Sequence, residues 1–222
     1  MENREFDLEG LKVLIAIPSY SGKIECECMM GIIDAKDALE KAGVEVDVVV
    51  QKGISLVQQA RNKLANAFMA GQWNRLVWID DDIGFKRNDL VRLVAFSTEF
   101  DIVAGAYPIK NIPMKVKVSP VLKEGRPAQG KYGLLEVEGM PLGFSIMSKN
   151  MFQVMSSDCK DFVFQDTPMK EYFKVEVKDG LLWGEDTGFC NQWRATGGKV
   201  WCDPSLKLQH IGPYVYECGF YD

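Results

Sequence analysis

The chain has 222 residues, of which 47% are hydrophobic and 26% are charged, and its formal net charge is −5. That length supports one well-filled α/β domain or at most two small ones, and the composition is ordinary for a globular protein. The negative charge excludes a generally basic surface for nucleic acid or an anionic membrane, and leaves only a local basic groove open.

Cysteine spacing and hydropathy give expectations about metal sites and location. The chain has six cysteines and one histidine, but it contains no CxxC pair. Zinc-finger spacing is therefore absent. The polar start, MENREFDLEG, is unlike a signal peptide, and no apolar run approaches the roughly 20 residues of a membrane span. We expect reduced thiols and a cytoplasmic protein without a transmembrane segment.

The first half of the chain alternates between apolar runs and segments with helical spacing. Gly43 and Gly71 end the first two helical segments, and Asn88 is expected to cap the third. This order predicts a parallel, doubly wound sheet. The expected strands are 11–18, 44–50, 75–79 and 101–106, and the expected helices are 29–42, 56–70 and 88–96.

Beyond Tyr107 the pattern changes, because Pro108, Pro113, Pro120 and Pro127, together with several glycines, interrupt any long element. A more antiparallel region is expected there, and no repeat or linker divides the chain. We therefore predict a single domain over 1–222. The elements expected in this half are strands at 116–122, 134–137 and 142–147, and helices at 150–155 and 187–196.

An acidic triplet, Asp80-Asp81-Asp82, follows directly on the third expected strand. Ligands of open α/β sheets bind beyond the carboxyl ends of the strands. Three adjacent carboxylates repel one another unless they share a cation, and Mg²⁺ or Mn²⁺ on such oxygens would neutralise a leaving diphosphate. The alternative is an acidic turn that caps a helix. An aspartyl phosphatase fits less well because the triplet follows the third strand, and a Walker-type ATPase lacks its GxxxxGK[ST] stretch.

Three segments in this order resemble the nucleotide half of the GT-A glycosyltransferases, particularly family 2: VLIAIPSYSG at 13–22, QQARN at 58–62 and VWIDDD at 77–82. The resemblance implies a GT-A, Rossmann-like fold with a mostly parallel sheet and a smaller antiparallel acceptor-side region. It implies a nucleotide-binding half at 11–106 and an acceptor-side half at 107–222. The resemblance is closer to the compact glycosyltransferases of large viruses and phages than to membrane-attached synthases.

The resemblance also implies roles for single residues of the first half. Arg61 would approach the base or the diphosphate, although a helix-surface arginine paired with an acid is the simpler alternative. Asp80 and Asp82 would be the outer members of a DxD motif, with Asp82 the more direct metal ligand. The nucleotide-binding set that it implies is Pro18, Ser19, Tyr20, Arg61, Asp80 and Asp81.

The second half supplies candidate sugar-binding residues. PLGFSIMSKNMF at 141–152 resembles the segment beneath the donor sugar and acceptor, where Gly143 would permit close approach of a ring and Phe144 would lie beside it. The alternative is an ordinary packing glycine. Lys110 follows the fourth strand, where contacts to the donor sugar or its diphosphate are expected.

WGEDTGFCNQWRATGGKVW at 183–201 resembles the family's ED motif. Inverting transfer needs a general base within hydrogen-bond reach of the acceptor hydroxyl. The motif implies that Asp186 is this base, that Glu185 binds substrate hydroxyls and that Trp183 lies by the sugar. The alternative is a helix cap, since acids are favoured in a first helical turn. His210 is either a structural hydrogen-bonding residue or, as the resemblance implies, the third metal ligand beside Asp80 and Asp82.

These expectations combine into one function with two alternatives. The expected enzyme is an inverting glycosyltransferase that uses Mn²⁺ or Mg²⁺, a UDP- or GDP-type sugar donor, and a glycan, protein or other hydroxyl acceptor. The segment VVVQKGIS lacks the acidic residue with which many family 2 members recognise uracil, so the identity of the nucleoside base stays open. The alternatives are a sugar-phosphate nucleotidyltransferase and an inactive binding module of the same fold. A viral source would place the protein in the host cytoplasm.

Overall fold

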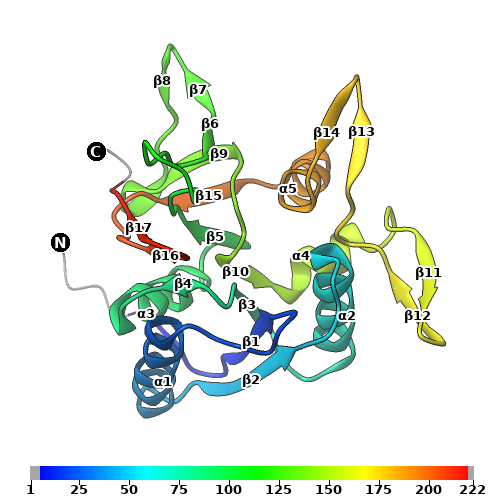
Figure 1. Cartoon of the computed structure of the whole chain (residues 1–222), viewed down its shortest axis with the longest axis horizontal. Helices are drawn as coiled ribbons and strands as arrows, with labels where there is room; N and C mark the ends of the chain where they lie inside the picture. Colours follow the sequence, from blue (N-terminus) through cyan, green and yellow to red (C-terminus); the bar gives the residue numbers. More distant parts are fainter. Residues whose placement is uncertain (1–5, 220–222) are drawn as a thin grey trace.

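The computed structural model describes residues 6–219, and its centre is an eight-stranded sheet (Figure 1). Buried apolar runs form its middle strands because both faces of the sheet are covered by helices. Strand β10 is antiparallel to both of its neighbours, β3 and β5, whereas β1 is parallel to β2 and β3. The order across the sheet is β2 (Glu45–Gln51), β1 (Lys12–Pro18), β3 (Arg75–Ile79), β10 (Phe144–Ser148), β5 (Ile102–Gly105), β15 (Val200–Asp203), β9 (Leu135–Gly139) and β6 (Ser119–Pro120).

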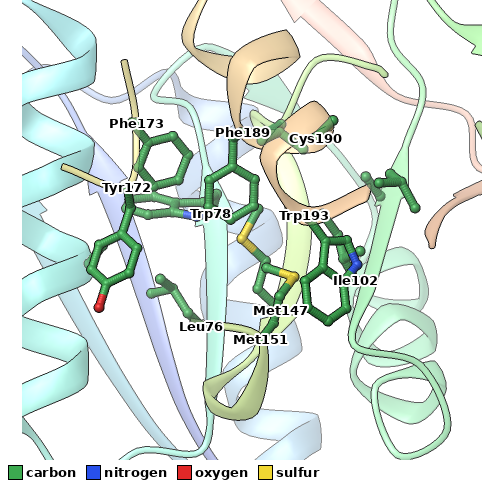
Figure 2. Close-up of a cluster of buried hydrophobic side chains, with 14 of the residues drawn as sticks. Leu76, Trp78, Ile102, Met147, Met151, Tyr172, Phe173, Phe189, Cys190 and Trp193 are labelled. Carbon is green, nitrogen blue, oxygen red and sulfur yellow. The ribbon is translucent and has the colours of Figure 1, made fainter. Parts of the chain in front are cut away.

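Five helices cover the two faces of this sheet: α1 (Cys26–Lys41), α2 (Val57–Ala70), α3 (Arg87–Phe96), α4 (Lys149–Met155) and α5 (Glu185–Ala195). The first and third pack on one face, where their apolar residues join one buried cluster. The other three supply the second cluster, on the opposite face. Figure 2 shows that second cluster, with Trp78 of β3 beside Phe173 and Phe189.

A small three-stranded sheet carries the C-terminal part of the described chain back to the acidic triplet. Its order is β17 (Val215–Glu217), β16 (Gln209–Ile211) and β4 (Ile83–Gly84). His210 pairs with Ile83 across this sheet. The lone histidine is therefore brought beside residues that lie more than one hundred positions earlier in the sequence.

Three hairpins extend from the sheet and complete the architecture (Figure 1). The hairpin of β13 and β14 lies beside the start of α5, and a single 3-10 turn, Lys131–Gly133, precedes β9. The hairpin strands are β7 (Leu122–Lys123) with β8 (Arg126–Pro127), β11 (Asp161–Phe164) with β12 (Thr167–Lys170), and β13 (Glu176–Lys178) with β14 (Leu181–Trp183).

The expected α/β architecture is confirmed, with two corrections to its details. The strand expected at 142–147 is antiparallel as expected, but it does not lie apart from the first-half strands, because it forms β10 between β3 and β5. A simple parallel series is thus interrupted, and both halves of the chain share one sheet. Asn88 does not cap α3; the Asp89 carboxylate accepts a hydrogen bond from the Lys86 backbone N–H at 2.8 Å instead. Within residues 6–219 no helix combines the length and apolarity that a membrane crossing needs.

Candidate functional site

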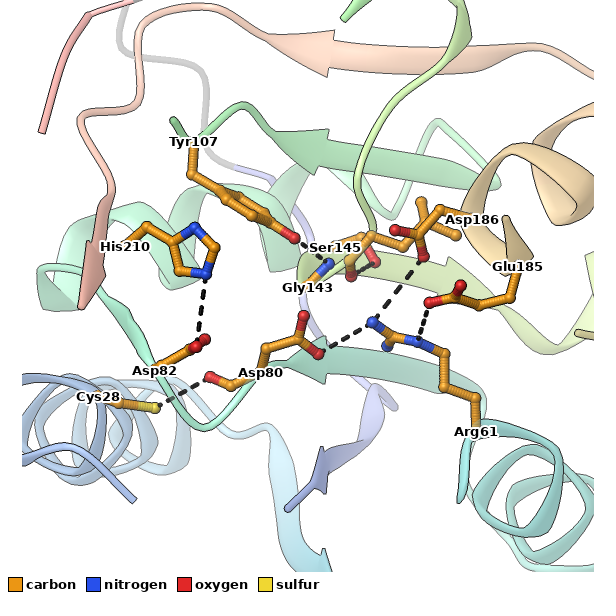
Figure 3. Close-up of polar contacts among 11 residues, drawn as sticks. Cys28, Arg61, Asp80, Asp82, Tyr107, Gly143, Ser145, Glu185, Asp186 and His210 are labelled. Atoms are coloured by element: carbon orange, nitrogen blue, oxygen red, sulfur yellow. Dashed lines mark hydrogen bonds and ion pairs between the residues drawn. The ribbon is translucent and has the colours of Figure 1, made fainter. Parts of the chain in front are cut away.

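The acidic triplet forms a tight turn between β3 and β4, held by backbone hydrogen bonds. The Asp80 N–H donates to the Gly143 carbonyl at 2.8 Å, and the Asp80 carbonyl accepts from the Ile83 N–H at 3.1 Å. The Asp82 carbonyl accepts from the Ile211 N–H at 2.8 Å. Gly143, directly before β10, and Ile211 of β16 thereby hold the turn, and the carboxylates of Asp80 and Asp82 point in different directions (Figure 3).

The Asp82 carboxylate faces two basic side chains. Its Oδ2 lies 2.5 Å from Lys110 Nζ and 3.4 Å from His210 Nε2. Burial opposes ionisation of this carboxyl, but the contacts with His210 and Lys110 outweigh burial and hold the pKa of Asp82 below its usual value. The His210 Nδ1 lies 2.8 Å from the Pro108 carbonyl oxygen. Since a carbonyl only accepts, Nδ1 is the donor in this contact, and Nε2 is the ring nitrogen that faces Asp82.

The Asp80 carboxylate turns the other way, toward Arg61 of α2 (Figure 3). Arg61 Nη2 lies 2.9 Å from Asp80 Oδ1, and the arginine side chain is 1% exposed. Burial alone would lower the pKa of Arg61, but Asp80, Asp186 and Glu185 raise it above its ordinary value. In this structure Arg61 is engaged by Asp80, and its contact with a nucleotide stays a prediction. The simpler alternative assumes an arginine on the surface of its helix, whereas the Arg61 side chain is buried.

The Glu185 and Asp186 side chains come from the first turn of α5 and face the same guanidinium. Glu185 Oε1 lies 3.7 Å from Arg61 Nε, and Asp186 Oδ1 lies 3.9 Å from Arg61 Nη2. Burial raises the pKa of Asp186 to about 7. The positive charge of Arg61 lowers this pKa, whereas the negative charges of Glu185 and Asp80 raise it further. Asp186 is thus poised to exchange a proton near neutral pH.

Gly143 lies where the two halves of the site touch. A Cβ atom at this position would lie 2.1 Å from Asp80 Oδ2 and 2.5 Å from the Tyr107 hydroxyl. The Gly143 N–H donates to that hydroxyl at 3.0 Å. Asp80 and Tyr107 therefore explain why a glycine is needed at position 143, and no sugar ring has to be invoked. The Phe144 ring is fully buried against Phe85 at a centroid distance of 4.8 Å, and the sugar contact expected of it stays a prediction.

A cavity of about 310 Å³ opens beside Asp186. Trp183, at the end of β14, forms one wall, and the segment after β9 forms another. The Lys178 ammonium lies 5.1 Å from the centroid of the Trp183 ring. The remaining lining residues mix charged, amide and hydroxyl groups with backbone: Lys117, Ser119, Glu138, Gly139, Met140, Pro141, Thr187 and Asn191.

The residues expected at the nucleoside lie at the carboxyl end of β1, beside the triplet. Ser19 is buried, and its hydroxyl donates to the Lys23 carbonyl at 3.0 Å and accepts from the Gly22 N–H at 3.1 Å. Burial raises the pKa of Asp81 above its usual value, although a hydrogen bond with Ser19 lowers it in part. Pro18 is partly buried, whereas the Tyr20 ring is 68% exposed and so does not cover the core.

The predicted metal ligands are brought together only in part. Asp82 and His210 are neighbours, whereas the Asp80 carboxylate is engaged by Arg61. Among residues 6–219, no group of three or more histidine, cysteine, aspartate or glutamate side chains is arranged to hold a metal ion.

Two structural residues of the site were not predicted in their observed roles. Tyr107 is buried, and its ring packs edge-on against His210 at a centroid distance of 5.3 Å. Asn62 pairs with the Phe173 backbone, donating to its carbonyl at 2.7 Å and accepting from its N–H at 2.8 Å. Position in the QQARN segment singles out Asn62, but its partner lies 111 residues away and has no sequence signal.

Comparison with known proteins gives a structural likeness and no sequence match. A scan against protein-family models found no match, and a search of the curated proteins found no significant match. A structure of GalNAc-T7 with UDP, GalNAc and Mn²⁺ matches 91% of this chain and 44% of its own, at 15% identity and a TM-score of 0.51.

S. aureus TarS residues 1–349 match 93% of this chain in two structures, both at 13% identity. The TM-score is 0.47 with UDP-GlcNAc, covering 58% of that chain, and 0.48 without it, covering 60%. This chain therefore spans less than two thirds of the length of these proteins. The likeness to GalNAc-T7 is one of fold, and the chain has the GT-A glycosyltransferase fold.

Proposed function

We propose that this protein is a glycosyltransferase that moves a sugar from a nucleoside diphosphate to an acceptor hydroxyl. The observation that carries the proposal is the convergence of two distant acidic segments. Asp80, at the end of β3, and Glu185-Asp186, at the start of α5, meet at the same arginine. On its other side Asp186 borders an open cavity. A base is thereby adjacent both to the strand-end donor region and to a space for an acceptor.

In the proposed reaction Asp186 is the general base for inverting transfer. It accepts the proton of the acceptor hydroxyl while that oxygen forms a bond to the anomeric carbon. The bond between this carbon and the diphosphate oxygen breaks with its electron pair, and the nucleoside diphosphate leaves. A pKa of about 7 suits this role, because a general base works best when its pKa lies near the operating pH.

We propose that Asp82 and His210 hold a divalent cation, Mn²⁺ or Mg²⁺. One carboxylate and one imidazole fit such an ion, because it commonly completes its shell with water and substrate phosphate oxygens. The contact of His210 Nδ1 with the Pro108 carbonyl supports this assignment, since it leaves Nε2 free to ligate. The ion would supply positive charge to the leaving diphosphate. In the structure Lys110 Nζ pairs with Asp82 Oδ2 at 2.5 Å. In the proposed donor complex Lys110 would pair with the diphosphate instead. A ligand role for Asp80 stays a prediction.

We propose a carbohydrate acceptor for the cavity beside Asp186. Trp183 offers an apolar face against which a sugar ring packs, and Glu138, Asn191 and Lys117 offer hydrogen bonds to hydroxyl groups. Such a mixture of one aromatic wall with several polar groups suits a small polar ligand and not a lipid chain. Pro18, Ser19 and Tyr20 would contact the nucleoside, with Asp81 nearby. The nucleoside base, the resemblance to viral and phage enzymes and a cytoplasmic location stay predictions.

The proposal is tested by incubating the full chain with Mn²⁺ and a panel of nucleotide sugars, with mono- and oligosaccharide acceptors. Release of nucleoside diphosphate together with a glycosylated product supports it. Release of pyrophosphate from a nucleoside triphosphate and a sugar phosphate would show a nucleotidyltransferase instead. Metal-dependent nucleotide binding without turnover of any donor would indicate an inactive module.

Variants separate the proposed roles within this assay. Asp82→Ala and His210→Ala should weaken metal-dependent binding of the nucleoside diphosphate, measured by calorimetry. Asp186→Asn should retain that binding and lose transfer. Trp183→Ala should raise KM for the acceptor and leave KM for the donor unchanged. Full transfer by Asp186→Asn would rule out its role as the base.

A further inference from the structure

Arg61 holds an unusual position among the charged groups of the site. It is 1% exposed and surrounded by three carboxylates, one from the end of β3 and two from the start of α5. The face of its guanidinium lies over Trp78, 5.2 Å from the ring centroid. A buried guanidinium costs several kcal/mol in lost hydration unless its charge and donors are compensated, so the fold retains it with partners from both halves of the chain.

The hydrogen bonds of this cluster are incomplete. Nη2 is bonded to Asp80, but Arg61 Nε and Nη1 are buried without a hydrogen-bond partner, as is Asp186 Oδ1. The separations of 3.7 Å to Glu185 and 3.9 Å to Asp186 slightly exceed hydrogen-bond length. A shift of about half an ångström or slightly more at the start of α5 would bring Glu185 to Nε and Asp186 Oδ1 to Nη2 at hydrogen-bond length. The unpaired Nε and the unpaired Asp186 Oδ1 thus face partners that are almost in place.

We infer that Arg61 is a positioning residue that couples Asp80 on the donor side to Glu185 and Asp186 on the acceptor side. This inference rests on the proposed function and concerns how its two half-sites communicate. One guanidinium is shared by three carboxylates, so a stronger bond to one weakens the hold on the others. Arginine suits this task because its planar fork presents five donors in fixed directions, whereas lysine offers a point charge on a flexible stem.

The inference predicts how substitutions at Asp80 affect Asp186. The charged and titratable groups that face Asp186 are Arg61, Glu185, Asp80, Tyr107 and Cys190. Asp80→Asn removes one negative charge and frees Arg61 Nη2 to pair with Asp186. Both effects favour the ionised form of Asp186, so its titration midpoint should fall. In an Arg61→Lys background the second effect is lost, and the same Asp80→Asn substitution should move the midpoint by less.

The test follows Asp186 directly by carboxyl ¹³C NMR in full-length protein labelled at aspartate. The Asp186 signal is the one that disappears in Asp186→Asn. Its midpoint is measured in wild type, Asp80→Asn, Arg61→Lys and the double variant. Arg61→Lys should raise the midpoint by about 1 pH unit, at the low end of the shifts caused by a nearby opposite charge. Unequal effects of Asp80→Asn in the two backgrounds support the coupling.

Arg92→Lys is the matched control, because Arg92 makes a comparable ion pair with Asp203, at 2.5 Å, outside this site. It should lower the melting temperature without moving the Asp186 midpoint. Equal effects of Asp80→Asn in both backgrounds, or an Arg61→Lys variant that only loses stability, would overturn the inference. If Arg61→Lys does not fold, an unchanged midpoint in Asp80→Asn would overturn it and a lowered one would support it.

The same experiment separates this inference from the proposed function. A coupled titration in a protein that turns over no nucleotide sugar would leave the inference standing and count against the transferase. Transfer activity in a protein whose Asp186 titration is not coupled to Asp80 would support the transferase and overturn the inference. In an active enzyme the acidic limb of the pH profile of kcat should move with the midpoint measured by NMR, which a purely structural arginine would not cause.

Discussion

Asp186→Asn should make the protein more stable at alkaline pH while it abolishes transfer. The pKa of Asp186 rises from 3.8 to about 7 on folding, because the carboxyl is buried beside Glu185 and Asp80. Below about pH 4 both the folded and the unfolded forms are protonated. Between about pH 4 and 7 the folded form holds a proton that the unfolded form has lost. Its contribution to stability is therefore present at low pH and lost as the pH rises through about 7.

The size of this effect follows from the shift. At 1.36 kcal/mol for each pKa unit, the folded protein loses about 3 kcal/mol between about pH 5 and pH 8 through this one group. Asparagine has nearly the same shape and does not ionise, so the variant should escape this loss. The difference corresponds to a melting temperature roughly 6–12 °C higher than that of wild type at about pH 8. At about pH 5 the two proteins should melt close together.

Thermal melting followed by circular dichroism at several pH values measures the difference, with calorimetry to confirm two-state unfolding. Asp34→Asn serves as the control, because Asp34 is an exposed aspartate on α1 and should show no pH-dependent difference from wild type. A melting difference between Asp186→Asn and wild type that is the same at about pH 5 and pH 8 would refute the assigned shift. It would also remove the argument that Asp186 is tuned to act as a base.

Two further substitutions test the packing that holds the site together. Gly143→Ala places a Cβ atom 2.1 Å from Asp80 Oδ2, so it should displace that carboxylate, lower stability by about 1–3 kcal/mol and abolish activity. Gly139→Ala, with its nearest atoms at 4.0 Å, should keep wild-type stability in urea denaturation. Asn62→Ala leaves the Phe173 N–H and carbonyl without partners in a buried place, and should cost about 2–4 kcal/mol in urea denaturation. Loss of stability in Gly139→Ala, or wild-type stability in Asn62→Ala, would contradict these predictions.

Much of the first half of the fold could be predicted from local pattern. Continuous apolar runs bounded by turn residues correspond to β1, β2 and β3, and the glycines after α1 and α2 lie at the ends of those helices. The buried strands β1 and β3 carry this signal because both of their faces are covered, whereas β2 is a largely exposed edge strand that is apolar in sequence. The short hairpins at 161–170 and 176–183 were not predicted. Their strands have three or four residues and several exposed apolar side chains, so they carry little periodicity.

The candidate site was predicted unevenly, and the reason lies in long-range pairing. The acidic triplet and the ED segment each have a recognisable local context, and the structure brings Asp80, Glu185 and Asp186 to one place. The partners that these acidic side chains contact carry no comparable local signal in the sequence. Position in the QQARN segment makes Arg61 a candidate nucleotide contact, but in the structure it is buried between Asp80, Trp78 and the acidic residues at the start of α5. Phe144 follows a flexible glycine, but its ring belongs to the core.

The sequence by itself determined which residues carry charge, which runs are buried strands, and that acidic groups follow a strand end. These properties depend on neighbours within a few positions. Only the tertiary structure decided that β10 enters the sheet between β3 and β5, and that Asp80 and Asp82 turn to opposite partners. The physical reason is that a carboxylate's direction and pKa depend on charges within a few ångströms, and here those charges come from positions up to 125 residues away, as for Arg61 and Asp186.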